Sequence, residues 1–124
     1  MITFRQRAGK DIARSLKRHS QVARREYSKA LNRSLAIVQR NVKLETPVRT
    51  GFLRNSIRQK RASRSRLIGV VEDWTDYGFY VHEGTSRGIS PNRFFERGIK
   101  KSDRLVEKEF GRAMDRVLKQ VSGR

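Results

Sequence analysis

A short segment near position 82 contains residue types that could do chemistry, but it does not complete a catalytic pattern. His82-Glu83 begins like the His-Glu-x-x-His helix of zinc hydrolases, yet the position of the second histidine is Ser86. The chain's one other histidine is His19, so no site with three histidine ligands can form. His82 is therefore expected to be a packing or hydrogen-bonding residue.

Candidate phosphate and cation sites are also incomplete. Gly84-Thr85-Ser86-Arg87-Gly88 lacks the spacing of a glycine-rich phosphate loop that ends in Lys-Ser or Lys-Thr. Asp73 and Asp76 could share a cation, but two acids on a loop are typical of a solvated segment. The sequence predicts no catalytic residue, no metal and no cofactor, and we expect a protein that is not an enzyme.

The charge of the chain indicates what it contacts. Its 124 residues include 30 Lys and Arg but only 12 Asp and Glu, which gives a formal net charge of +18, and there is no cysteine. Such a body attracts polyphosphates or acidic protein surfaces. The positive charge leaves two alternative functions open. The chain could be a free nucleic-acid-binding protein, or a small basic ribonuclease that uses Arg, Lys, Tyr and His at the phosphate. No apolar run is long enough for a membrane span, so no membrane partner is expected.

One window, Leu67 to Ser86, contains no Lys or Arg although the chain is so basic. Its acids and aromatic residues predict a surface for docking another protein chain, because a protein that only coats nucleic acid needs no such window. The subunit-interface candidates are Glu72, Asp73, Trp74, Asp76 and Tyr77.

The apolar spacing predicts an α+β fold with a long N-terminal helix, a small antiparallel sheet of two or three strands, and a long C-terminal helix. Apolar residues recur every three or four positions between Lys10 and Glu45, where there is no Gly or Pro, and a break is expected near His19-Ser20. Residues 1–124 are predicted to form a single domain. Its expected parts are a basic arm over 1–20, a helix over 21–46, a hairpin and sheet region over 50–85, and a helix over 91–121.

The middle of the chain is expected to form a hairpin. Ile57–Ser63 and Leu67–Glu72 read as two strands, and the second should face the core because it is the more apolar. The segment 77–81 fits either a third strand or one helical turn. Cations on the hairpin could face a DNA channel, and the candidates are Arg58, Lys60, Arg61, Arg64 and Arg66.

Two segments at a particular distance resemble a known family. Thr46-Pro47-Val48-Arg49-Thr50-Gly51-Phe52-Leu53-Arg54-Asn55-Ser56-Ile57 follows the long helix, and Tyr77-Gly78-Phe79-Tyr80-Val81-His82-Glu83-Gly84-Thr85 lies about twenty residues further on, before Ser90-Pro91-Asn92-Arg93-Phe94-Phe95. The pair resembles the neck or tail-completion proteins, also called minor tail components, of long-tailed bacteriophages. In two places the chain departs from the family pattern: the acid directly precedes Gly84, and the Pro-Phe pair is split as Pro91-Asn92-Arg93-Phe94.

The residues of these segments are expected mainly to determine the fold. Pro47 should end the helix, Thr50 should cap the next turn, Gly51 should allow close approach of the backbone, and Gly84 should supply a positive φ. The full set is Pro47, Thr50, Gly51, Leu53, Ser56, Ile57, Tyr80, Val81, Glu83, Gly84, Thr85, Pro91 and Phe94.

The resemblance implies a virion structural protein at the head–tail junction. It implies a homo-oligomeric ring around the DNA channel that joins tail to head and contacts other phage neck and tail proteins. It also implies assembly in the host cytoplasm, and it allows non-specific contacts with genomic DNA. An acidic segment of one subunit could then meet the basic helix face of the next.

Overall fold

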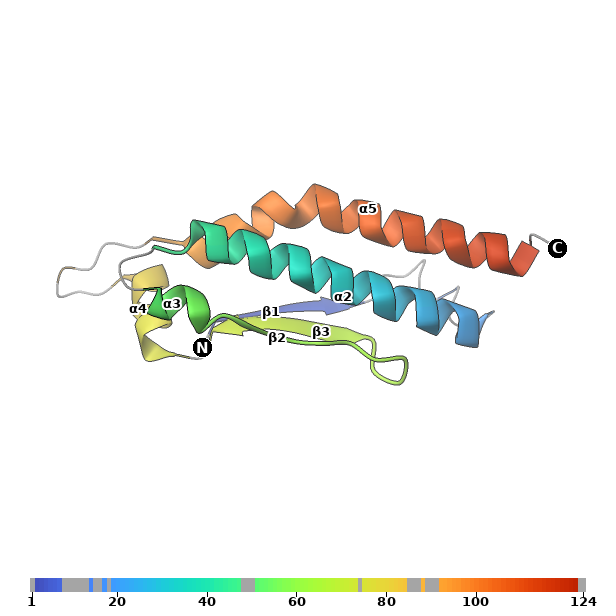
Figure 1. Cartoon of the computed structure of the whole chain (residues 1–124), viewed down its shortest axis with the longest axis horizontal. Helices are drawn as coiled ribbons and strands as arrows, with labels where there is room; N and C mark the ends of the chain where they lie inside the picture. Colours follow the sequence, from blue (N-terminus) through green and yellow to red (C-terminus); the bar gives the residue numbers. More distant parts are fainter. Residues whose placement is uncertain are drawn as a thin grey trace.

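The computed structural model describes residues 2–7, 14, 17, 19–47, 51–73, 75–84, 88 and 92–122, without the side chains of residues 6, 7, 76, 77 and 122. Its elements confirm the predicted α+β fold, with two long helices and a three-stranded antiparallel sheet (Figure 1). They are β1 (Ile2–Arg7), α2 (Ser20–Glu45), α3 (Phe52–Asn55), β2 (Arg58–Lys60), β3 (Ile68–Asp73), α4 (Asp76–Glu83) and α5 (Phe94–Ser122).

The sheet has the order β1-β3-β2, and both of its pairings are antiparallel. The predicted hairpin corresponds to β2 and β3, but the third strand comes from the N-terminal segment that was expected to be an arm. Segment 77–81 is helical, because Thr75 caps α4 by accepting a hydrogen bond from the Gly78 N–H at 3.1 Å. β3 is therefore the central strand, paired along both edges.

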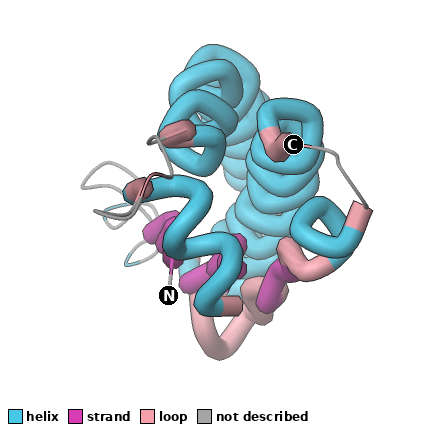
Figure 2. The backbone as a smooth tube through the Cα atoms, turned by 90° about the vertical axis from the view of Figure 1, so that its left-hand side faces the viewer, coloured by secondary structure: helices cyan, strands magenta, loops and turns pink. Residues whose placement is uncertain are grey.

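The two long helices lie side by side over one face of the sheet (Figure 2). Their contact has two hydrophobic clusters, one beside the sheet and one toward the C-terminal end of α5. The buried apolar side chains of α2 keep the predicted helical spacing and are Ala23, Tyr27, Ala30, Leu31, Leu35, Val38 and Val42.

Glycine permits the closest approach between α2 and α5. A Cβ on Gly98 would lie 2.5 Å from the Val42 Cα and 2.6 Å from the Val42 nitrogen, so the backbones of the two helices nearly touch. Gly69 similarly brings β3 against the Leu35 side chain of α2. Gly98 therefore has a packing role in the contact between the two helices.

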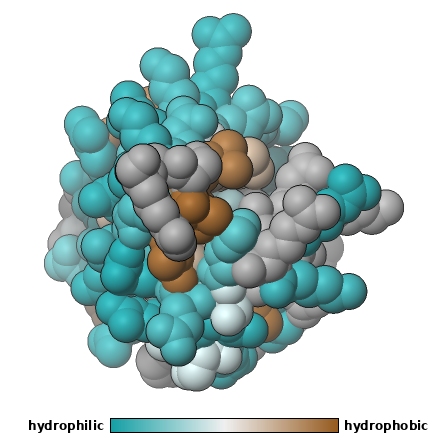
Figure 3. Space-filling model, turned by 90° about the vertical axis from the view of Figure 1, so that its right-hand side faces the viewer, coloured by the Kyte–Doolittle hydropathy of each residue, from teal (hydrophilic) through white to brown (hydrophobic). Residues whose placement is uncertain are grey.

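The end of the molecule at the right of Figure 1 is mainly hydrophilic. In the space-filling view of that end, apolar side chains show in small patches among polar ones (Figure 3). Apolar side chains that are exposed elsewhere include Phe52 of α3 and Phe79 and Tyr80 of α4, which belong to the opposite end of the molecule in Figure 1.

Candidate functional site: the open sheet face and the basic hairpin

The face of the sheet that points away from the helices is polar and basic. Strand alternation turns Phe4 and Val71 toward the helices, so their neighbours along each strand point the other way. The register aligns Thr3, Glu72 and Arg58 in one row across the sheet, and Arg5, Val70 and Lys60 in the next. The exposed side chains of these rows are Thr3, Arg5, Arg58 and Lys60.

Of the five predicted DNA-channel candidates, the structure places Arg58 and Lys60 on this face, together with Arg5, which the sequence analysis did not single out. Lys60 reaches the Glu72 carboxylate at 3.4 Å. Because the Lys60 side chain is 73% exposed, this pair contributes little stability and leaves the ammonium accessible. The open face therefore keeps a net positive charge.

The other three candidates, Arg61, Arg64 and Arg66, lie on the loop that joins β2 to β3, and all three residues are exposed. A tight turn closes this loop: the Ser63 N–H donates to the Arg66 carbonyl at 2.9 Å, and the Arg66 N–H donates back to the Ser63 carbonyl at 3.2 Å. The hairpin tip thus holds its cations on a defined backbone.

Three polar side chains of α2 attach the hairpin to the helix. The Asn32 amide donates to the Ala62 carbonyl at 3.0 Å, and its oxygen accepts from the Ala62 N–H at 2.8 Å. Gln39 donates to the Ile57 carbonyl at 3.0 Å, and Arg24 donates to the Arg64 carbonyl at 2.9 Å. The sequence analysis missed these residues, although the seven-residue spacing of Asn32 and Gln39, two turns of helix, was a visible signal.

Two of the five predicted subunit-interface residues, Glu72 and Asp73, are buried and not exposed as expected. Asp73 is fully buried and Glu72 is 8% exposed. The Asp73 carboxylate accepts from the Thr75 N–H at 3.0 Å and from the Thr75 hydroxyl at 2.7 Å, so it orders the turn into α4. Glu72 and Asp73 complete the sheet rather than project from it. Trp74 and the side chains of Asp76 and Tyr77 lie outside the described residues, and their docking role stays a prediction.

The first half of the resemblance surrounds α3. Leu53 and Ile57 are buried in the core cluster beside the sheet, and the Ser56 hydroxyl donates to the Leu53 carbonyl at 2.6 Å. Gly51 is the N-cap with φ 76°, so its need for glycine is the positive φ and not a close backbone approach. Pro47 is exposed after α2, and Thr50, the predicted cap, lies outside the described residues.

The second half joins α4 to α5. Gly84 ends α4 with φ 80°, the positive angle that was expected. Backbone bonds from the Asn92 N–H to the Val81 carbonyl at 3.1 Å and from the Arg93 N–H to the His82 carbonyl at 3.2 Å connect the two helices.

Side chains around this junction strengthen it. Glu83 pairs with Arg93 at 3.1 Å, and the buried His82 ring packs edge-on against the buried Phe94. Tyr80 is 47% exposed, and Val81 packs partly buried against the core. Thr85 and Pro91 lie outside the described residues.

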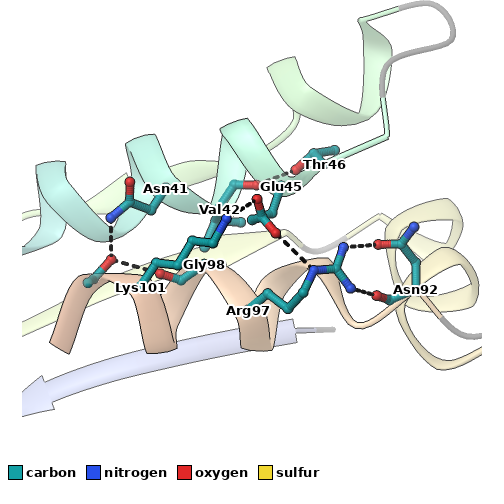
Figure 4. Close-up of polar contacts among 9 residues, drawn as sticks. Asn41, Val42, Glu45, Thr46, Asn92, Arg97, Gly98 and Lys101 are labelled. Carbon is teal, nitrogen blue, oxygen red and sulfur yellow. Dashed lines mark hydrogen bonds and ion pairs between the residues drawn. The ribbon is translucent and has the colours of Figure 1, made fainter.

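Two glutamates on α2 connect it to α5. Glu45 accepts from Lys101 at 2.8 Å and from Arg97 at 2.9 Å (Figure 4), and these bonds lower the pKa of Glu45. Burial raises the pKa of Glu26, but hydrogen bonds from Arg116 at 2.9 Å and Gln120 at 3.2 Å, with nearby positive charge, lower it overall. Both pairs are structural and lie away from the open face.

Among the described residues, no group of three or more His, Asp or Glu side chains is placed to hold a metal ion. None of the described helices is long and apolar enough to cross a membrane.

The comparison with protein families identifies the chain. No curated protein and no solved structure matches it. The family model described as "Bacteriophage HK97-gp10, putative tail-component" matches residues 10–84, which is more than half of the chain and includes α2, the hairpin and α4. The chain therefore belongs to the HK97-gp10-like family of bacteriophage tail components.

Proposed function

We propose that this tail component acts at the neck of the virion, where copies of the chain form a ring around the DNA channel and join the tail to the head. The observation that carries the proposal is the open sheet face, which presents Arg5, Arg58 and Lys60 on the side away from both long helices. In a ring, such a face lines the lumen and meets the DNA backbone.

The chemistry of this face fits DNA that must slide. Lys and Arg neutralise phosphates without reading bases, and such contacts are individually weak and sensitive to salt. A lumen of this kind neutralises the passing genome without holding it in one register.

The test of location is electron microscopy of particles made with and without the protein. Without it, we expect complete tails that remain unattached and heads that lose their DNA. Normal joined particles in its absence would overturn the neck proposal.

The lumen assignment needs a separate variant. Arg5→Ser with Arg58→Ser and Lys60→Ser should leave joining intact but slow DNA ejection or lower DNA retention. The matched control is Lys100→Ser with Lys108→Ser and Lys119→Ser, which also removes three exposed cations but takes them from α5. Equal effects of the two variants would show that net charge matters and that this face does not.

Free nucleic-acid binding, the alternative kept from the sequence, makes a different prediction for the hairpin. A monomer that binds DNA through the open face should lose about 0.9 from its log–log salt slope for each phosphate contact removed. We expect the isolated monomer to bind only weakly, with the DNA contact completed by the ring. The ribonuclease alternative is disfavoured at one point, because His82 is buried against Phe94 and is not presented to a phosphate.

A further inference from the structure

We propose that neighbouring subunits join through a groove between β1 and α5, which receives the β2–β3 hairpin tip of the next copy. This inference rests on the proposed ring and names its subunit interface. It takes its acidic contacts from α5 and not from Glu72 and Asp73, because those two predicted interface residues are buried.

The receiving groove is apolar at its base and acidic at its rim. It is a hollow of about 140 Å³ lined by Phe4 of β1, Val38 of α2, and Ile99 and Val106 of α5. Its acidic rim is formed by Asp103 and Glu107 of α5. The hollow adjoins β1, an outer strand of the sheet, so this side of the described subunit ends in a strand edge next to an acidic rim.

The acids of this rim lie along one line of α5. Glu96, Asp103 and Glu107 are spaced by seven and four residues, and at 3.6 residues per turn these positions fall within a narrow stripe. All three are exposed. The stripe borders the apolar face of α5, and Lys100 lies at its edge, whereas the other cations of α5 fall further round the helix.

The rim acids have no ion-pair partner among the described residues. Among the ion pairs of the described residues, none includes Asp103 or Glu107. Other glutamates in the same part of the chain do have basic partners, including Glu26, Glu45 and Glu109. In a chain with 30 basic residues, acids that project without a basic partner beside an apolar hollow indicate a cation supplied from outside.

The hairpin tip supplies that cation from the opposite edge of the sheet. β2 is the other outer strand, and β3 separates it from β1. Arg61, Arg64 and Arg66 are exposed at the tip, and none of them has an ion pair among the described residues. The tip is held by Asn32 and by its own turn, so docking it costs little ordering entropy.

Complementary surfaces on opposite edges make a heterologous contact. Each subunit uses its hairpin on one side and its groove on the other, and a contact of this kind closes into a ring when the rotation between copies is right. The five basic candidates then divide by role. Arg61, Arg64 and Arg66 belong to the interface, and Arg58 and Lys60 remain on the open face.

The absence of cysteine from the sequence permits a clean crosslinking test. A chain that carries both Arg64→Cys and Glu107→Cys, assembled into particles and oxidised, should give a ladder of dimers, trimers and larger species up to a closed ring. The control is Arg64→Cys with Asp115→Cys, because Asp115 is an exposed acid of α5 that lies off the acidic stripe. Dimers alone, no crosslinks, or an equal ladder from the control would each overturn the interface.

Charge exchange gives an independent readout. Asp103→Lys with Glu107→Lys should weaken association by at least about tenfold, because like charges would face each other across the contact. Adding Arg61→Glu and Arg64→Glu to the same chain should restore association. Thermal melting checks that each variant folds, and failure of the combined variant to associate while folded would overturn the pairing.

The outcomes also separate this inference from the neck proposal. A crosslinked ladder in particles where the protein lies away from the neck would support the interface and overturn the location. A neck location without the crosslinked ladder would support the location and overturn the interface.

Discussion

Gly98 offers the sharpest test of how the two long helices pack, because the same substitution at Gly111 should have the opposite sign. Both glycines lie inside α5, where Ala is favoured over Gly by about 1 kcal/mol on propensity alone. A Cβ at Gly111 would have no neighbour within 4 Å. A Cβ at Gly98 would lie 2.5 Å from the Val42 Cα, far inside the 3.4 Å at which ordinary contact begins.

The size of the effect follows from which atoms must move. The obstructing atoms belong to the backbone of α2, so no rotamer change relieves the overlap, and α2 and α5 must separate by about 1 Å. Such overpacking costs about 1–3 kcal/mol, and the upper part of that range applies where backbone must shift. The separation would also disturb the hydrogen bond that the Asn41 amide donates to the Ser102 hydroxyl. That hydroxyl donates in turn to the Gly98 carbonyl (Figure 4). After the propensity gain, Gly98→Ala should destabilise the protein by about 1–2 kcal/mol.

Thermal and urea unfolding measure the difference directly. A change of 1 kcal/mol should shift the Tm of a chain of this size by roughly 4 °C, so Gly98→Ala should melt lower by roughly 4–8 °C and Gly111→Ala slightly higher. A Gly98→Ala variant as stable as the wild type would refute the close helix contact. Destabilisation by Gly111→Ala would refute the assumption that its surroundings are open.

Three further changes test other contacts. Asn32→Ala removes both side-chain bonds to Ala62 and should cost about 1–3 kcal/mol in urea unfolding, with faster amide exchange at the hairpin, whereas unchanged exchange would contradict the attachment. Gly84→Ala should cost about 1–3 kcal/mol, because φ 80° with ψ 173° is a conformation that essentially only glycine adopts, and a neutral effect would show that the turn relaxes. Glu26→Gln should cost about 1 kcal/mol at pH 7, since charged hydrogen bonds are stronger than neutral ones. The pKa of Glu26 is lowered from 4.5 on folding, so the stability that the charged Glu26 contributes is complete above about pH 4.5 and is lost as the pH falls through the folded pKa. If the difference in unfolding free energy between the wild type and Glu26→Gln grew on acidification, the pairing would be contradicted.

The elements that could be predicted were those whose signal is local. The three-and-four apolar spacing identified α2 and α5, and the apolar run near Val71 identified the central strand. The edge strand β1 was missed because Ile2–Arg7 is short, has apolar residues only at Ile2 and Phe4, and ends in Arg5-Gln6-Arg7, which also reads as a charged arm. Only pairing with β3 distinguishes an edge strand from a charged arm, and that pairing joins residues that are 61 to 71 positions apart in the sequence.

The candidate site was predictable in its composition but not in its arrangement. Five hairpin cations were identified from sequence, yet their division between the open face and the tip depends on strand register and on where β2 ends. Arg5 lies in the same row of the sheet as Lys60 only because β1 pairs with the other edge of β3. The attachment by Asn32 and Gln39 was also hidden, because polar residues on a helix look solvated until the element beside them is known.

The distribution of acids along the sequence indicates where function should be sought in this chain. The window without Lys or Arg is explained largely by the fold, since β3 is central, its Val71 is buried, and Asp73 orders the turn into α4. The acids of α5 attract no attention in a linear census, because cations stand between them. On the helix, however, Asp103 and Glu107 fall on one stripe beside an apolar hollow, and no ion pair within the described part of the subunit accounts for them. Acids that have no ion pair in the described part of the subunit are a better guide to a partner than a charge-poor segment, and here they point to a second copy of the same chain.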